Sequence, residues 1–141
     1  SLCALSPAMH AEFLQPYHSR LSEVLGHNRI YYHGCEDLTA KFDIIRQLPN
    51  LRRFHISPWS NLEVAAEQLQ RDFVLETHAH PGDTLLVHSE AQMREALERI
   101  MSVAGDCVLD INLSDIHTVN GNPAVLATWA RVAQEVTERH G

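Results

Sequence analysis

The sequence predicts an α/β protein of the (β/α)₈ TIM-barrel type, here a half-barrel of four parallel βα units plus an N-terminal helix. Runs rich in β-formers alternate with runs at helical spacing along the 141 residues. No hairpin dipeptide joins consecutive strands, so each strand should be followed by a crossover helix and pair in parallel. No glycine-rich phosphate loop follows any strand, which disfavours a dinucleotide-binding fold.

The opening helix is predicted from its capping residues and its periodicity. Ser6 suits the N-cap and Pro7 the first helical position. The apolar repeat stops at Gly26, and Pro16 should kink the helix. The repeat consists of Met9, Phe13, Tyr17, Leu21 and Leu25.

Four βα units follow this helix. We expect the strands at Arg29 to His33, Leu51 to Ile56, Phe73 to Leu75 and Val108 to Leu113. The helices should span Leu38 to Leu48, Asn61 to Leu69, Ser89 to Val103 and Pro123 to Arg139. The inward residues of the last helix should be Leu126, Trp129, Val132, Ala133 and Val136.

Length and composition predict a single domain over residues 1–141 and exclude several classes of function. A formal net charge of -7 leaves no basic stripe for nucleic acid. The apolar runs are far shorter than the roughly 20 residues that cross a bilayer. Three widely spaced cysteines favour a reducing cytoplasm over a disulfide framework. Half a barrel in one chain also leads us to expect a fragment of a larger protein.

Polar residues follow all four strands, and parallel α/β folds place their ligand sites there. The segments read HGCED (33 to 37), SPWSN (57 to 61), THAHP (77 to 81) and LSDIHT (113 to 118). We therefore expect six side chains to converge at one end of the sheet: His33, Cys35, His78, His80, Asp115 and His117.

Three pairs in these segments have i, i+2 spacing, which places both side chains on one side of an extended segment. His33 and Cys35 have the spacing of a zinc half-site, although a strand-end cysteine can also act as a small hydrophobe. His78 with His80, and Asp115 with His117, are alternatively parts of solvated loops. Trp59 is either a pocket wall or structural. Cys107 begins the fourth strand, over about 20 Å from Asp115, and should not join the site.

These segments resemble the C-terminal half of uroporphyrinogen-decarboxylase-like proteins, a superfamily that includes corrinoid and coenzyme M methyltransferases and, more distantly, cobalamin-independent methionine synthase. The resemblance covers the chain from about Ser6 onward. Its most specific parts are the Cys35-Glu36 pair, the Ser57-Pro58-Trp59 turn and the D-I-x-T-V stretch from Asp115 to Val119. It implies a TIM barrel.

The resemblance implies methyl transfer to a thiol, with zinc held through the His33-x-Cys35 pair. The family's later cysteine falls where this chain has Ser114 and Asp115, so His117 or His80 would have to replace it. The decarboxylase branch has a histidine in that turn, which this chain lacks. The alternatives are a lyase without metal and a non-catalytic, self-associating fragment.

The sequence therefore leads to a set of expected roles. The parent protein is expected to be an enzyme, and this chain alone to be inactive. Zinc and a partner-bound corrinoid are the expected cofactors. The partners are a small-molecule substrate, a corrinoid protein, and either the missing N-terminal half-barrel or a second copy, because open strand edges demand cover. The expected site residues are Asp115 and Glu36 in catalysis, Ser57, Trp59, His78 and His117 for substrate, and His33, Cys35 and His80 for metal.

Overall fold

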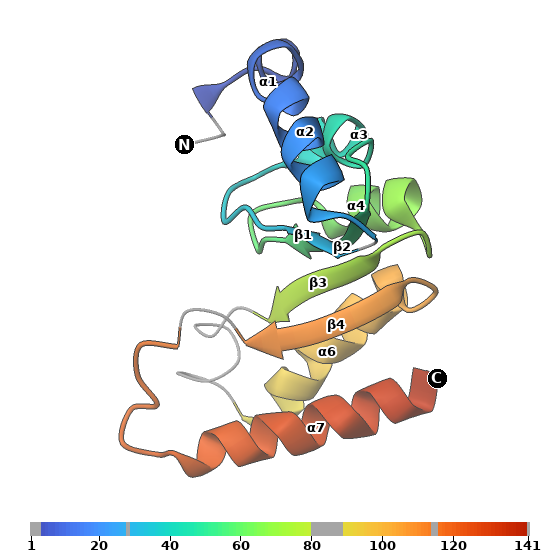
Figure 1. Cartoon of the computed structure of the whole chain (residues 1–141). Helices are drawn as coiled ribbons and strands as arrows, with labels where there is room; N and C mark the ends of the chain where they lie inside the picture. The colour runs from blue at the N-terminus through green and yellow to red at the C-terminus, as the bar shows by residue number, and fades with distance from the viewer. Residues whose placement is uncertain (1–3, 28, 80–88, 114–115, 141) are drawn as a thin grey trace. The chain divides into compact units, whose positions relative to one another are not determined.

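A computed structural model describes residues 4–27, 29–79, 89–113 and 116–140 (Figure 1). Its helices are α1 (Pro7–Phe13), α2 (Gln15–Leu25), the 3₁₀ turn η2 (Thr39–Lys41), α3 (Phe42–Ile45), α4 (Leu62–Leu69), α6 (Glu90–Ala104) and α7 (Ala124–His140). Its strands are β1 (Ile30–Tyr32), β2 (Leu51–Ile56), β3 (Val74–Ala79) and β4 (Val108–Leu113). The chain divides into two compact units, Ser1–Thr77 with Asp106–Asp110, and His78–Gly105 with Ile111–Gly141.

The strands form one parallel sheet in the order β1-β2-β3-β4, which confirms the predicted α/β class. Strand β1 pairs with β2 through Tyr31 and Arg53, and β2 pairs with β3 through His55 and Glu76. Each strand lies beside its predecessor in the chain, so the order does not reverse as it does in a doubly wound sheet. The order therefore places the ends of consecutive strands next to one another.

The first unit has a hydrophobic core between the strands and the helices that follow them. The predicted inward residues Leu38, Phe42, Ile45 and Leu48 are all buried, although the expected helix there is reduced to η2 and α3. The helical segment begins at Thr39 rather than at Leu38. The carboxylate of Asp37 accepts hydrogen bonds from the backbone and hydroxyl of Thr39 and stabilises a turn there instead.

The opening segment forms two helices rather than one kinked helix. Pro16 lies in the first turn of α2, where its missing N–H costs nothing, and the break falls at Leu14. The predicted apolar repeat does not enter the core of the first unit. Its members are exposed at 43% to 68%: Met9, Phe13, Tyr17, Leu21 and Leu25.

The second unit contains α6 packed against α7. Ser89 and Gln92 form a capping box at the start of α6, as Ser89 predicted. The buried residues between the two helices include Met93, Leu97, Trp129, Val132 and Val136. Leu126 was expected to face inward but is 37% exposed, because it lies in the first turn of α7.

No helix in the described part of the chain is long and apolar enough to cross a membrane.

Candidate metal centre

One face of the sheet in the first unit is polar, which is unusual for parallel strands. Successive residues of a strand point to opposite faces, so Arg53 and His55 alternate with the buried Phe54 and Ile56 on β2. The strand register then places His55 beside Glu76 of β3. A polar row on a face that is normally apolar indicates a functional site.

Three side chains of this face, His33, His55 and Glu76, are close enough to hold one metal ion. Each offers one ligand atom within 4.8 Å of the others. His55 Nδ1 lies 3.5 Å from Glu76 Oε1, and the His33 and His55 rings stack with centroids 4.1 Å apart. His55 and Glu76 are buried, whereas His33 is exposed, so the group opens to solvent on the His33 side.

The hydroxyl of Tyr31 contacts all three residues of this group. It donates a hydrogen bond to Glu76 Oε1 at 2.8 Å, and it lies 2.7 Å from His33 Nδ1 and 3.4 Å from His55 Nδ1. Burial raises the pKa of Tyr31 above its ordinary value, and the hydrogen bond to Glu76 is the second largest cause. The phenol therefore keeps its proton at neutral pH when the group holds no ion.

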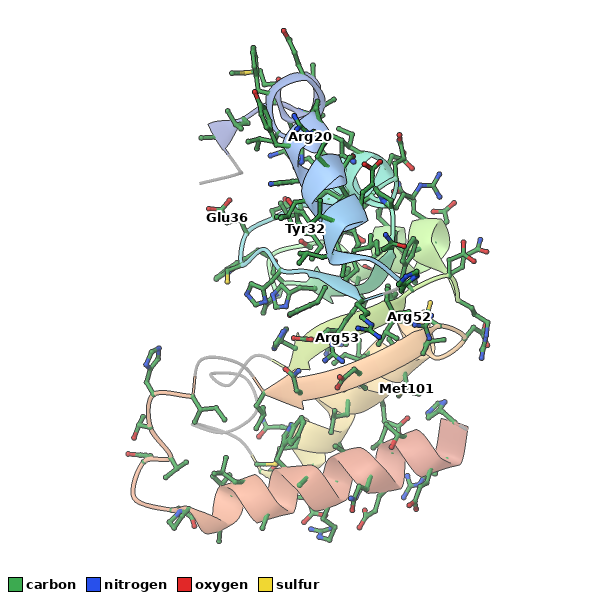
Figure 2. The ribbon with its side chains drawn as sticks, viewed as in Figure 1. Arg20, Tyr32, Glu36, Arg52, Arg53 and Met101 are labelled. Carbon is green, nitrogen blue, oxygen red and sulfur yellow. The ribbon has the colours of Figure 1, made fainter. Side chains whose placement is uncertain are left out.

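Arg53 balances the buried carboxylate of Glu76. Its Nε donates to Glu76 Oε2 at 2.5 Å, and a second guanidinium nitrogen pairs with Asp110 of β4. The guanidinium also lies 5.5 Å from the centre of the Tyr31 ring. The Arg53 side chain is labelled in Figure 2. Arg53 thus fixes one oxygen of Glu76 and leaves the other directed at Tyr31 and His55.

Cys35 contacts the opposite nitrogen of the His33 ring. Its Sγ lies 3.0 Å from His33 Nε2, while His33 Nδ1 faces Tyr31. The predicted pair is therefore in contact, but Cys35 is outside the three-residue group. A thiol in this position can orient the imidazole through its second nitrogen, as the outer partners of metal-bound histidines do.

The remaining expected residues of the first unit lie around the segment after β2. Ser57 is buried, and its hydroxyl donates to the backbone carbonyl of Glu36 at 2.8 Å, which ties together the ends of β1 and β2. The Glu36 side chain is partly buried, and Trp59 is 69% exposed. Their predicted roles in catalysis and substrate binding stay predictions.

Other expected residues lie in the second unit or outside the described residues. His78, on β3, is partly buried, and His117, after β4, is exposed. His80 and Asp115 lie outside the described residues, so the predicted convergence of six side chains stays a prediction. Cys107 packs against the core just before β4, and burial raises the pKa of its thiol.

Sequence reasoning missed His55, Glu76, Tyr31, Arg53 and Asp110. They lie within strands, whereas the expected site residues all come from the segments after the expected strands. The available signal was the alternation of charged with apolar residues in R-F-H-I and L-E-T, which departs from the continuous apolar pattern of a buried parallel strand. Which of these residues meet depends on the strand register.

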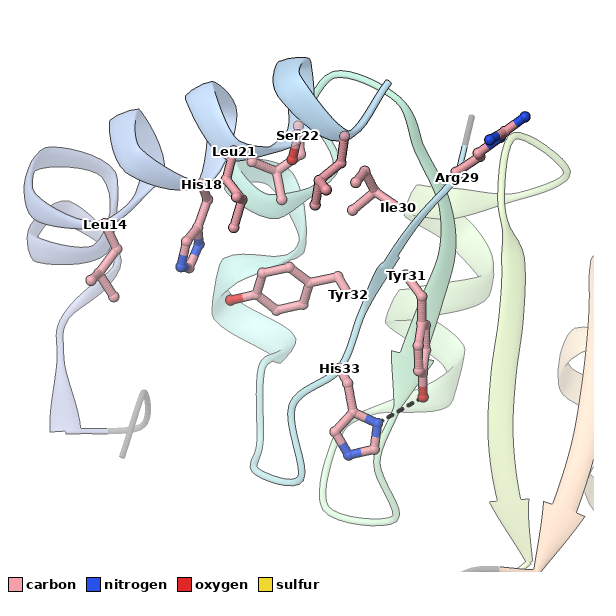
Figure 3. A pocket seen from close by; sticks show the side chains of 11 residues that line it. Leu14, His18, Leu21, Ser22, Arg29, Ile30, Tyr31, Tyr32 and His33 are labelled. Atoms are coloured by element: carbon pink, nitrogen blue, oxygen red, sulfur yellow. Dashed lines mark hydrogen bonds between the residues drawn. The ribbon is translucent and has the colours of Figure 1, made fainter. Parts of the chain in front are cut away.

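A pocket of about 630 Å³ lies between α2 and β1 and reaches the candidate metal centre. Leu14, Leu21 and Leu25 line it from the helices, and Tyr31 and His33 line it from the β1 side. Figure 3 shows Tyr31 and Tyr32 directed to opposite sides of β1, with the Tyr31 hydroxyl bonded to His33. A mainly apolar ligand in this pocket would therefore meet two residues of the site.

The donor atoms fit a zinc ion in chemistry, and one of their spacings matches a tetrahedral shell. Two imidazoles and a glutamate form a known ligand set of catalytic zinc sites, whose fourth position holds water or substrate. Bonds of about 2.0–2.2 Å in a tetrahedral shell place the ligand atoms about 3.3–3.6 Å apart. The 3.5 Å between His55 Nδ1 and Glu76 Oε1 lies in that range.

No protein-family model matches the chain, no curated protein is similar to it, and no solved structure matches its fold.

Proposed function

We propose that this chain is the zinc-binding half of a methyl-transfer enzyme of the uroporphyrinogen-decarboxylase-like superfamily. The observation that carries the proposal is the group of His33, His55 and Glu76, whose ligand atoms lie within 4.8 Å of one another. The sequence resemblance supplies the reaction class. The parallel sheet in chain order is what half of a (β/α)₈ barrel would contain.

In this proposal, zinc supplies a positive charge that lowers the pKa of a substrate thiol and keeps it deprotonated. His33, His55 and Glu76 hold the ion. Arg53 keeps the Glu76 carboxylate in place, and Cys35 orients the His33 ring. The thiol approaches through the pocket under α2, whose apolar walls suit a substrate with a short carbon chain. The methyl donor is a corrinoid held by a partner protein, in a reducing cytoplasm.

A second candidate function is the activation of a water molecule for hydrolysis. The ligand group within the described residues contains two histidines and a carboxylate and no thiolate. That composition is typical of zinc sites that lower the pKa of bound water. Thiol binding to the metal-loaded protein favours methyl transfer, whereas hydrolysis of an activated ester without thiol binding favours this alternative.

Metal analysis of cysteine variants tests the proposed site. The unmodified protein should bind one zinc ion per chain. Cys35→Ser should weaken zinc affinity about 10–100-fold, the usual effect of losing an outer partner of a metal-bound histidine. Cys107→Ser should leave affinity unchanged, since Cys107 packs against the core away from this group. Titration calorimetry with zinc gives all three affinities, and an unmodified protein that binds no zinc would contradict the proposal.

We also propose that the exposed face of α1 and α2 packs against more protein, either the N-terminal half-barrel or a second copy. Val24 is 84% exposed, beside the exposed repeat, and contiguous apolar patches on proteins mark interaction surfaces. We expect the isolated chain to self-associate at micromolar concentration. Val24→Glu should shift sedimentation toward the monomer, whereas Ala127→Glu, on an exposed position of α7, should not. A monomeric unmodified chain would contradict this expectation.

A further inference from the structure

The oxygen of Tyr31 lies within hydrogen-bonding reach of all three residues of the candidate metal centre. It is 2.7 Å from His33 Nδ1, 2.8 Å from Glu76 Oε1 and 3.4 Å from His55 Nδ1. Catalytic zinc sites with three protein ligands keep a fourth position for an exchangeable group. The space beside His33, His55 and Glu76 is therefore occupied by the side chain of Tyr31.

The distances distinguish two positions for the Tyr31 oxygen. It could take the place of the ion at the centre of the shell, or the place of a fourth ligand at a corner of the shell. Its oxygen, His55 Nδ1 and Glu76 Oε1 form a triangle with sides of 2.8, 3.4 and 3.5 Å. An atom at the centre of the shell would lie much closer to both ligands than they lie to each other. The 3.4 and 3.5 Å sides instead match the edges of a tetrahedral shell, whose corners are about 3.3–3.6 Å apart. The 2.8 Å side, and the 2.7 Å between the Tyr31 oxygen and His33 Nδ1, are hydrogen-bond distances that would lengthen when these atoms bind one ion.

From this geometry we propose that Tyr31 is the fourth, exchangeable ligand of the ion, and that a substrate thiol takes its place. The inference rests on the proposed function, because it needs an ion at His33, His55 and Glu76. In binding, the Tyr31 oxygen gives up the hydrogen bond that it now donates to Glu76, and its proton passes to solvent.

The location of Tyr31 allows it to leave the ion again. It belongs to β1, a three-residue strand at the edge of the sheet, and it is 40% exposed. Its hydroxyl contacts the metal group, and Tyr31 is among the residues that line the pocket under α2, although its side chain points to the side of β1 opposite to Tyr32 (Figure 3). Between turnovers, Tyr31 would exclude water from the ion. A substrate thiol would then have to bind the ion tightly enough to displace Tyr31.

Cobalt(II) substitution tests this role, because the visible bands of cobalt report its ligands and a thiolate adds a charge-transfer band. The Tyr31→Phe variant removes only the hydroxyl, and Tyr17→Phe is the matched control at a position that is 68% exposed. Tyr31→Phe should change the visible bands and weaken cobalt affinity at least about tenfold. The variant should bind 2-mercaptoethanol about tenfold more tightly, because no side chain then competes for the position.

Each outcome of the cobalt experiment has a separate meaning. Unchanged bands and unchanged thiol affinity in a folded Tyr31→Phe protein would overturn the role of Tyr31 and leave the metal centre standing. An unmodified protein that binds no cobalt would overturn the proposed function itself. Changes of the same size in Tyr17→Phe would assign the effect to tyrosine loss in general and also overturn the inference. Circular dichroism establishes that each variant is folded.

Discussion

Replacement of Glu76 by Gln should abolish stoichiometric zinc binding while the chain stays folded. The amide has nearly the same shape as the carboxylate, but it brings no charge to the ion. Glu76 is one of three ligands in the proposed centre, so the loss in affinity should exceed the 10–100-fold effect typical of outer partners. Arg53 also loses the negative charge that faces its Nε, although the amide oxygen of glutamine can still accept a hydrogen bond. Metal content after dialysis and zinc titration calorimetry measure this loss.

Glu76→Gln should lower the unfolding free energy by less than the loss of one partner from a fully buried ion pair would. Removal of one partner from a fully buried ion pair costs about 3–5 kcal/mol. The side chain of Arg53 is 34% exposed and keeps its second partner, Asp110, so solvent screens its remaining charge. Glu67→Gln, on the exposed surface of α4, is the matched control and should bind zinc normally. A folded Glu76→Gln protein with unchanged zinc affinity would place the ion elsewhere.

Much of the fold was predictable because its signals are local. The strands Leu51–Ile56 and Val108–Leu113 have their predicted bounds, and Asn61 and Ser89 cap α4 and α6 as their side chains indicate. Such signals act within a few residues, through periodicity and capping. There are exceptions. The helix expected at Leu38 to Leu48 is reduced to η2 and α3. The exposure of the apolar repeat in the opening helices depends on what surrounds them rather than on their own sequence.

The candidate site was less predictable because it depends on strand register. The pair His33 and Cys35 was found from its spacing, and the two side chains are in contact. His55 and Glu76 are separated by a whole βα unit, and they meet only because β2 and β3 pair with His55 opposite Glu76. A shift of one residue would turn Glu76 to the other face of the sheet. Sequence spacing carries no information about that choice.

Replacement of Phe54 by Ala should cost about 3–5 kcal/mol of unfolding free energy, the usual loss for a large buried aromatic residue. Phe54 is fully buried on β2, on the face opposite to His55. Its ring contacts Phe42 edge-on, with centroids 5.4 Å apart, and lies 5.8 Å from the ring of Tyr32. The alanine would leave a cavity between β2 and α3. Because domains are stable by only about 5–15 kcal/mol, much of the protein should unfold at modest urea concentration.

Phe13→Ala is the matched control for this loss, since it removes the same side chain from a position of α1 that is 55% exposed. In a monomeric chain, Phe13→Ala should lower the unfolding free energy by no more than about 0.5 kcal/mol, as most surface substitutions do. Urea unfolding followed by circular dichroism compares the two variants at low protein concentration. A small effect of Phe54→Ala would contradict the packing of β2 against α3. A large effect of Phe13→Ala that grows with protein concentration would instead show that a second copy covers the α1 face, because association adds to apparent stability by mass action.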